Sequence, residues 1–344
     1  MNIFFFRNTI LASACISLVV GMACSKKSGG GVTPPPVNPD SPTVAMGLIK
    51  LPATWVKAGG YMQGFPEGVE VYHNVTPYKN KALNAYCVVF DPKNSSLDLK
   101  MVLPSANKKV TDQCAAESGT VLAGINGGFF GTNASYSLVE YNNTISAINI
   151  RSLSRTYNGA ATTYYPTRAA FGLTAAGIPT IAWIYHTGAG NGTIYSYPAP
   201  SPNALNQAPQ QQPTTSFPAG GSVWNAVTAI GGSPVLIVDS VIRLTDTEEM
   251  IDIDNTSSRA RSALGYTASG KVVILAVEGG NSSGGVGLSL QDLAGLMLEM
   301  GCKGAMNLDG GGSTYMQVNG QATVKPSDAV GERPVMGAII LKKK

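Results

Sequence analysis

Charged side chains are scarce in this sequence of 344 residues. Asp, Glu, Lys and Arg together make up 13%, about half the share that is usual in soluble domains. The net charge is only +4, and no block of basic residues stands out. We therefore expect no nucleic-acid partner. With 44% hydrophobic residues, the chain has ample material for a folded core.

Histidine and cysteine are also sparse. The only histidines are His73 and His186, so imidazole ligation of a metal has little support and we expect neither a metal nor a cofactor. Beyond the first 24 residues the cysteines are Cys87, Cys114 and Cys302. Two of them could pair in an exported protein. Their odd number argues against a disulfide framework, and we interpret them as buried, small apolar residues.

Several motifs that carry chemistry are absent. There is no G-x-x-x-x-G-K-[ST] loop, no strand–G-x-G-x-x-G–helix and no G-x-S-x-G elbow at Ser313, which argues against common nucleotide-binding loops and hydrolase elbows. Asp252 and Asp254 alternate in "IDIDN" (251–255) and could meet Ca²⁺. Their spacing differs from that of a known calcium loop, so we interpret this stretch as a surface strand or loop.

The first 24 residues resemble an export signal. A lone Arg7 precedes an apolar stretch from Thr9 to Met22, and "GMAC" ends it. The stretch is too short and interrupted for a transmembrane helix and fits a signal peptide. Cys24 lies where bacterial lipoproteins are lipidated, although simple secretion is an alternative. We expect an exported protein of the bacterial cell envelope, attached to the membrane through its lipid alone.

The residues after Cys24 divide into a tether and a domain. Residues 25–45 are rich in Gly, Pro and Ser and predict a flexible tether. From residue 46 to 344 we expect one mixed α/β domain, richer in strand than in helix. A segment at 187–222 is polar and rich in Pro and Gln, and it predicts a long insertion at the surface.

Two segments of this domain echo each other. "TRAAFGLTAAGIPTIAW" (167–183) and "ARSALGYTASGKVVILA" (260–276) share several identical positions. Each reads as strand, tight turn and strand, and each opens with an arginine, Arg168 or Arg261. We infer two related β-hairpin units in one sheet system.

The last third of the chain predicts a β-α-β crossover. A continuous apolar strand (272–278) precedes a helix (289–301), and a second strand follows at 305–308. Ser289 suits a helix N-cap, and Gly301 suits a stop. Such a unit implies a parallel pair of strands. The loops that follow both strands, which carry Glu278 and Asp309, should then face one crevice.

The sequence "NLDGGGST" (307–314) combines a carboxylate, three glycines and two hydroxyls in one short stretch. Asp309 precedes three glycines, whose N–H groups could converge into an anion cradle, with hydroxyls from Ser313 and Thr314 beside it. The alternative is a tight turn in which Asp309 caps its own backbone. The residues alone leave both interpretations open.

A family resemblance adds to this interpretation. "NGGFF" (126–130), "AIGGSPVLI", "RSALGYTASGKVVILAVEGG", "NLDGGGSTYM" and "ERPVMGAIIL" occur in that order, which resembles the phosphodiester glycosidase family. That family includes enzymes that remove N-acetylglucosamine from mannose 6-phosphate. The resemblance spans residues 85–341. One departure is Glu278, where the family often has Asp.

The resemblance implies hydrolysis between a sugar's anomeric carbon and the oxygen of a phosphodiester, such as an N-acetylglucosamine-1-phosphodiester. Asp309 would work at the anomeric carbon as base or nucleophile, and Glu278 would be the second carboxylate. Arg261, and after it Arg168, would grip the phosphate, although either could instead form a structural ion pair at its strand end. Further implied substrate or phosphate contacts are Asn126, Gly127, Gly128, Gly310, Gly311, Gly312, Ser313 and Thr314.

Two other functions stay open at this point. A non-catalytic surface lipoprotein that binds glycans would suit the tether, the low charge and the tyrosine-rich segments "TTYYP" and "TIYSYP". A phosphodiesterase that cuts at phosphorus would use the same ligand. The partner expected in every case is a sugar phosphodiester or a phosphate-linked glycan.

Overall fold

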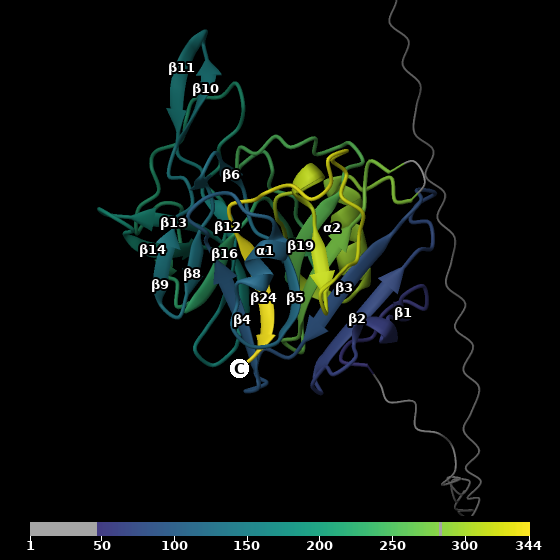
Figure 1. Cartoon of the computed structure of the whole chain (residues 1–344). Coiled ribbons are helices and arrows are strands. Elements are labelled where there is room, and N and C mark those ends of the chain that lie inside the picture. Colours follow the sequence, from purple (N-terminus) through teal and green to yellow (C-terminus); the bar gives the residue numbers. More distant parts are fainter. Residues whose placement is uncertain (1–46, 282–283) are drawn as a thin grey trace, which may run out of the picture. The chain divides into compact units, whose positions relative to one another are not determined.

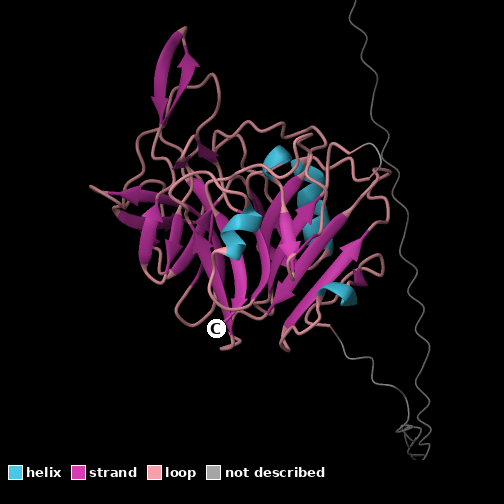
Figure 2. Cartoon of the chain, viewed as in Figure 1, coloured by secondary structure: helices cyan, strands magenta, loops and turns pink. Residues whose placement is uncertain are grey.

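Strands dominate the structure, a computed structural model that describes residues 47–281 and 284–344. Most of them lie in three antiparallel sheets (Figures 1 and 2). This confirms the mixed, strand-rich fold class. The expected signal peptide (1–24), Cys24 and the tether (25–45) lie outside the described residues. None of the helices that are described is long and apolar enough to cross a membrane.

The largest sheet has eight strands. Its order is β1 (Val56–Lys57), β2 (Val69–Asn74), β3 (Ala85–Phe90), β20 (Val272–Val277), β19 (Arg261–Thr267), β21 (Cys302–Asn307), β17 (Val235–Val238) and β18 (Val241–Ile242).

The second sheet has seven strands and the third has five. The seven are β15 (Ser222–Val223), β14 (Thr193–Tyr197), β13 (Pro179–Thr187), β12 (Arg168–Leu173), β16 (Thr228–Gly231), β8 (Val139–Tyr141) and β9 (Thr144–Ala147). The five are β23 (Gln321–Ala322), β22 (Met316–Val318), β5 (Val121–Asn126), β24 (Ala338–Lys343) and β4 (Leu97–Val102).

Short elements complete the domain. The pair β10–β11 extends away from the three sheets (Figure 1). The two-stranded pairs are β10 (Leu153–Tyr157) with β11 (Ala160–Tyr164) and β6 (Phe130–Gly131) with β7 (Ala134–Ser135). The helices are α1 (Val110–Ala115) and α2 (Leu290–Glu299), with 3-10 turns η1 (Gly59–Tyr61) and η2 (Gly311–Ser313).

One apolar core is shared by the three sheets. Alternating side chains of each sheet point into it, such as Val88, Ile125 and Phe171, as expected for strands with one buried face. A second cluster lies between the eight-stranded sheet and α2. The predicted apolar face of α2 is buried there, and the hydroxyl of Ser289 accepts the N–H of Asp292, which confirms the N-cap.

The predicted crossover forms, but its two strands are not neighbours. Both β20 and β21 pair antiparallel with β19, so they run in the same direction with β19 between them. The tight hairpin turn keeps β19 beside β20. Strand β19 therefore occupies the place next to β20 where the sequence predicted β21. As a result, Arg261 at the start of β19 lies at the same sheet edge as the ends of β20 and β21.

Both predicted hairpins form as β12–β13 and β19–β20. They lie in different sheets, the seven-stranded and the eight-stranded one, and meet only through the shared core. The local sequence specifies a hairpin, whereas strands far away in the sequence decide which strands pair with its two outer sides. The segment 187–222 is also partly built into a sheet, since β14 pairs with β13. Within it Ser201 and Asn203 are buried.

The cysteines behave as the sequence predicts. Cys87, Cys114 and Cys302 are all buried and free of disulfides. Burial raises the pKa of the Cys114 and Cys302 thiols to about 12, so neither thiol is a reactive nucleophile.

A buried carboxylate ties the seven-stranded sheet to the eight-stranded one. Glu249 is fully buried and accepts the N–H of Ala169 on β12 at 2.9 Å and that of Val235 on β17 at 2.8 Å. The indole of Trp183 and the hydroxyls of Ser233 and Thr245 also donate to it. Burial raises the pKa of this carboxyl group, against the hydrogen bonds that lower it.

Replacement of this carboxylate should destabilise the domain. Glu249→Ala leaves several buried donors without an acceptor, and each such donor costs about 1–3 kcal/mol. We expect the free energy of unfolding to fall by roughly 3 kcal/mol or more in urea denaturation. The exposed Glu67→Ala should change it by no more than about 0.5 kcal/mol. Equal stabilities of the two variants would show that the tie is dispensable.

Candidate functional site

A small cavity opens where β19 begins and β21 ends. Its volume is about 170 Å³, below the roughly 300–1,000 Å³ of typical ligand pockets. It therefore suits one charged group of a ligand, with the remainder outside. The lining residues are Ile253, Asp254, Arg259, Arg261, Asp309, Gly310 and Gly311.

Asp309 brings a perturbed carboxyl group to this cavity. Burial raises its pKa to about 6, and this rise is opposed by hydrogen bonds from Ser313 and the Gly310 N–H and by the charge of Arg333. The Gly310 N–H donates to Asp309 Oδ1 at 2.9 Å, so the alternative in which Asp309 caps its own turn is present. A carboxyl group with this pKa can take up or release a proton near neutral pH.

Asn126 holds Asp309 in place from another sheet. Its amide nitrogen donates to the Asp309 carbonyl at 2.8 Å. Its amide oxygen accepts the hydroxyl of Ser262 on β19 at 2.7 Å and the N–H of Tyr315 at 3.3 Å. Asn126 is fully buried and does not line the cavity. Its side chain is therefore a positioning group and does not contact a ligand in the cavity.

The expected cradle of free amides is not formed. The N–H of Gly310 donates to Asp309, that of Gly311 to the Ala260 carbonyl at 2.8 Å, and that of Gly127 to the Gly337 carbonyl at 2.9 Å. The turn satisfies its own backbone because its residues pack tightly against β19 and β5. Gly310 and Gly311 still line the cavity as backbone walls.

Gly312 and Gly128 are required by close contacts. A Cβ atom on Gly312 would collide with the side chains of Arg333 and Asp328. One on Gly128 would collide with the Gly231 carbonyl and with Ser137. Neither glycine lines the cavity, so both allow close packing around the turn.

Ser313 and Thr314 are buried directly behind the turn. The Ser313 hydroxyl bonds to Asp309 and receives Arg333 Nη1 at 3.4 Å. The Thr314 hydroxyl has no partner among the described residues. The hydrogen bond from Ser313 thus lowers the pKa of Asp309. The hydroxyls of Ser313 and Thr314 do not line the cavity.

Arg333 is a site residue that sequence reasoning missed. Its guanidinium lies against Gly312 and donates to both carboxylate oxygens of Asp328, at 2.7 and 2.9 Å. Its side chain is 43% exposed, so it can still meet a ligand near Asp309. The available signal was its place in "ERPVMGAIIL", one of the stretches that carry the family resemblance.

Arg261 is a buried cation in the wall of the cavity. It is 1% exposed and donates to the carbonyls of Leu288 at 2.9 Å, Asp254 at 2.8 Å, Ser257 at 3.2 Å and Ile253 at 3.4 Å. Burial lowers its pKa to about 10. No carboxylate bonds to it in the part of the chain that the structure describes. The Asp254 carboxylate stabilises this charge without a direct bond, and a buried cation without a bonded carboxylate favours an anion in the adjoining cavity.

Arg259 supplies a second guanidinium at the rim. It lines the same cavity and pairs with the carboxylate of Asp254, at 2.7 Å from its Nε. Asp254 lies in a surface loop, as predicted for "IDIDN", and so does Asp252. Across residues 47–281 and 284–344, no group of three His, Cys, Asp or Glu side chains could hold a metal ion.

Arg168 is not brought to this cavity. It begins β12 in the seven-stranded sheet and is 6% exposed. Burial lowers its pKa to about 10, while Glu249 opposes this effect and Arg155 adds to it. The two arginines that look equivalent in the sequence echo therefore lie in different sheets, and only Arg261 shares a cavity with Asp309.

Glu278 lies at the same sheet edge but is fully engaged. Its carboxylate accepts Asn84 Nδ2 at 2.7 Å, Asn281 Nδ2 at 2.8 Å, the Lys325 N–H at 2.9 Å and the Gly285 N–H at 3.0 Å. Burial alone would raise its pKa, but these hydrogen bonds outweigh burial and lower it. Glu278 does not line the cavity of Asp309, and it joins three loops beside it.

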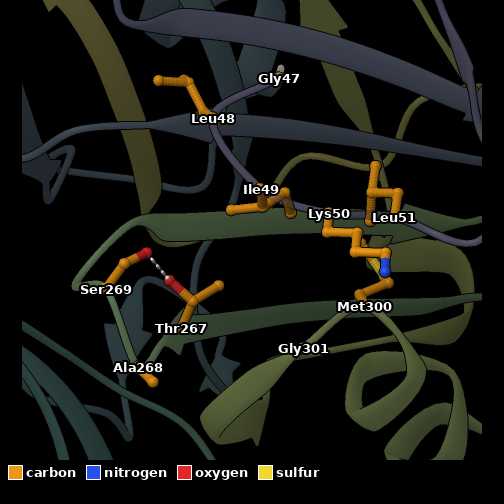
Figure 3. A pocket seen from close by; sticks show the side chains of 10 residues that line it. All are labelled: Gly47, Leu48, Ile49, Lys50, Leu51, Thr267, Ala268, Ser269, Met300 and Gly301. Carbon is orange, nitrogen blue, oxygen red and sulfur yellow. Dashed lines mark hydrogen bonds between the residues drawn. The ribbon is translucent and has the colours of Figure 1, made fainter. Parts of the chain in front are cut away.

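A larger cavity lies at the opposite edge of the eight-stranded sheet (Figure 3). Its volume is about 710 Å³, and Leu48, Ile49 and Leu51 line one wall. The hairpin turn at Ala268 and the end of α2 form the other. No carboxylate lines this cavity, so size alone does not identify the reactive site.

Comparisons with known proteins agree with the fold. A sequence profile of the phosphodiester glycosidase family matches residues 119–342. No match among curated proteins was found. The catalytic domain of zebrafish N-acetylglucosamine-1-phosphodiester α-N-acetylglucosaminidase, auto-inhibited by its pro-peptide, is 17% identical, with a TM-score of 0.54 over 82% of this chain and 85% of that one.

A hypothetical protein from Synechocystis is similar to the same extent. It is 18% identical, and its TM-score is also 0.54. The match covers 82% of this chain and 63% of the Synechocystis chain, so this chain spans less than two thirds of that protein. At such identities the structural likeness establishes the fold alone.

The raised pKa of Asp309 predicts a dependence of stability on pH. Because the folded-state pKa is about 6, against the usual 3.8, this group's contribution to stability is fully present below pH about 4 and is lost as the pH rises through 6. Relative to Asp309→Asn, the wild type should therefore lose stability between pH 4.5 and 7. Urea denaturation at both pH values measures this difference. Parallel changes in both proteins would contradict the raised pKa.

Proposed function

Because this chain belongs to the phosphodiester glycosidase family, we propose that it hydrolyses the bond between a sugar's anomeric carbon and a phosphodiester. The observation that carries this proposal is one cavity that holds the Asp309 carboxyl group beside the guanidinium of Arg261. We further propose N-acetylglucosamine-1-phosphodiesters as the substrate class. The name of the zebrafish enzyme with the similar fold supports this choice.

The chemistry follows from the charges around the cavity. The phosphate would bind beside Arg261 and Arg259, where the buried guanidinium of Arg261, which no carboxylate of the described residues bonds, favours it. Asp309 would act at the anomeric carbon, either as the base that takes a proton from water or as the nucleophile. The C–O bond then breaks, and its electron pair leaves with the phosphate. Since phosphate is a stable anion, protonation of the leaving group matters less here than in ordinary glycosides.

The geometry favours a supporting role for Glu278. Glycosidase chemistry usually requires two carboxyl groups, but the four donors around Glu278 leave it little capacity to transfer a proton. We propose that Glu278 fixes the loops beside the cavity. The phosphate-gripping role considered for Arg168 has no support, because Arg168 begins β12 in another sheet and does not line the cavity of Asp309.

Mutation of Asp309 tests the proposal. Asp309→Asn should keep the fold and reduce cleavage of a nitrophenyl phosphodiester of N-acetylglucosamine by at least about 10²–10³. In the wild type, kcat/KM should fall as the pH drops below about 6, because Asp309 then becomes protonated. Asp239→Asn, a change at an exposed turn, is the matched control and should retain full activity.

The released product separates the remaining alternatives. The proposal requires free N-acetylglucosamine, whereas release of the sugar phosphate would indicate a phosphodiesterase that cuts at phosphorus. Arg261→Lys should weaken turnover of phosphodiesters more than that of plain glycosides, since a lysine has too few donors to bond the four carbonyls and still reach the phosphate. No cleavage by the wild type, with glycan binding intact, would indicate a binding protein instead.

We also propose that the protein is exported and anchored through a lipid on Cys24. The support is the sequence before residue 25, with its apolar stretch and "GMAC". In a bacterial host, the wild type should fractionate with membranes and incorporate labelled palmitate. Cys24→Ala should lose the label and leave the membrane fraction. Unchanged membrane association without label would exclude the lipid anchor.

A further inference from the structure

A second cavity shares a wall with the one that holds Asp309. Its volume is about 710 Å³, within the range of pockets that bind small ligands. Ile251, Asp252 and Asn255 line it, while the intervening Ile253 and Asp254 line the cavity of Asp309. One stretch of chain therefore separates the two cavities.

The shared wall is held firmly from both sides. Arg261 donates to the carbonyls of Ile253 and Asp254. Asn255 Nδ2 donates to Asp246 Oδ2 at 2.6 Å and to the Ile251 carbonyl at 3.2 Å. The same arginine that lines the candidate phosphate site thus fixes the wall of the second cavity, so the two cavities lie on either side of one stretch of chain.

The remaining walls come from the least regular parts of the chain. Arg155 belongs to the hairpin β10–β11 (Figure 1), and its Nη2 donates to the Met250 carbonyl at 3.4 Å. Ala204 and Leu205 belong to the segment 187–222. The hairpin and the inserted segment therefore line the same cavity beside the candidate site.

The lining favours a neutral, hydroxyl-rich ligand. Asp246 and Asp252 face the cavity with a single guanidinium, that of Arg155, so an anion would be repelled. The Asp252 carboxylate is exposed and accepts no hydrogen bond from the described residues, which leaves it open to hydroxyl donors. Leu205 offers an apolar surface, 51% exposed, on which the carbon face of a sugar ring can pack.

We propose that this cavity is a subsite for neutral sugar residues of a phosphate-linked glycan, whose phosphate lies beside Arg261. The assignment rests on the proposed function, which places the scissile bond at Asp309. The occupancy of the cavity by sugar can be measured without any cleavage. It makes a glycan, rather than a small phosphodiester, the natural substrate class.

Calorimetry on the Asp309→Asn protein tests the subsite. Chitotriose and mannotriose serve as neutral probes, and mannose 6-phosphate serves as the anionic one. Adding Ala204→Arg should fill the cavity and weaken binding of the neutral probe by at least about tenfold. The matched control Ala268→Arg places the same side chain in the equally large cavity of Figure 3 and should leave binding unchanged. Thermal melting establishes that both variants are folded.

The outcomes separate the two proposals. Equal affinities in all three proteins, or no binding of either trisaccharide, overturn the subsite even if phosphodiesters are cleaved. Binding of mannose 6-phosphate that Ala204→Arg abolishes overturns the assignment to neutral sugars. A third outcome is that Ala204→Arg weakens trisaccharide binding but the wild type cleaves no phosphodiester. This result supports the subsite and overturns the proposed reaction.

Discussion

The candidate site depends on one buried amide. Asn126 ends β5 in the five-stranded sheet, yet it bonds to Ser262 in the eight-stranded sheet and to the backbone of Asp309. Its nitrogen also donates to the Gly127 carbonyl and its oxygen also accepts from Tyr315, so the full capacity of the amide is used. A buried amide with four partners has one stable orientation. It therefore fixes the turn after β21 relative to β19, and with it the distance between the carboxyl group and the guanidinium.

Charge balance explains why this edge of the sheet is suited to chemistry. Arg261 is buried among carbonyls without a carboxylate of its own, while Arg259 at the rim is paired with Asp254. Burial of Asp309 raises its pKa to about 6, which reduces the attraction between it and the nearby cations at mildly acidic pH. Both perturbations favour the binding of an anion at the same place. Arg333, held by Asp328 against Gly312, adds a third cation that remains partly open to solvent.

The glycine turn and the irregular segments border two neighbouring cavities in this chain. The crossover through α2 and the glycine turn lie in residues 119–342, the part that matches the family. The hairpin β10–β11 and the segment around Leu205 border a separate cavity across a single stretch of chain from Arg261. Variation in such loops on a fixed scaffold is a common way to change which ligand is bound. The proposed sugar subsite is lined in part by such loops.

The sequence determined what depends on near neighbours: the strands, the two hairpins, the capped helix α2 and the turn in which Asp309 binds the next N–H group. It also placed Glu278 and Asp309 at one edge of the sheet. Only the tertiary structure decided that β19 lies between β20 and β21, that Arg168 is in another sheet, and that Arg333 covers Gly312. It also assigned partners to the glycine amides and to Glu278. These outcomes depend on hydrogen bonds and packing between residues far apart in the chain, which no local pattern encodes.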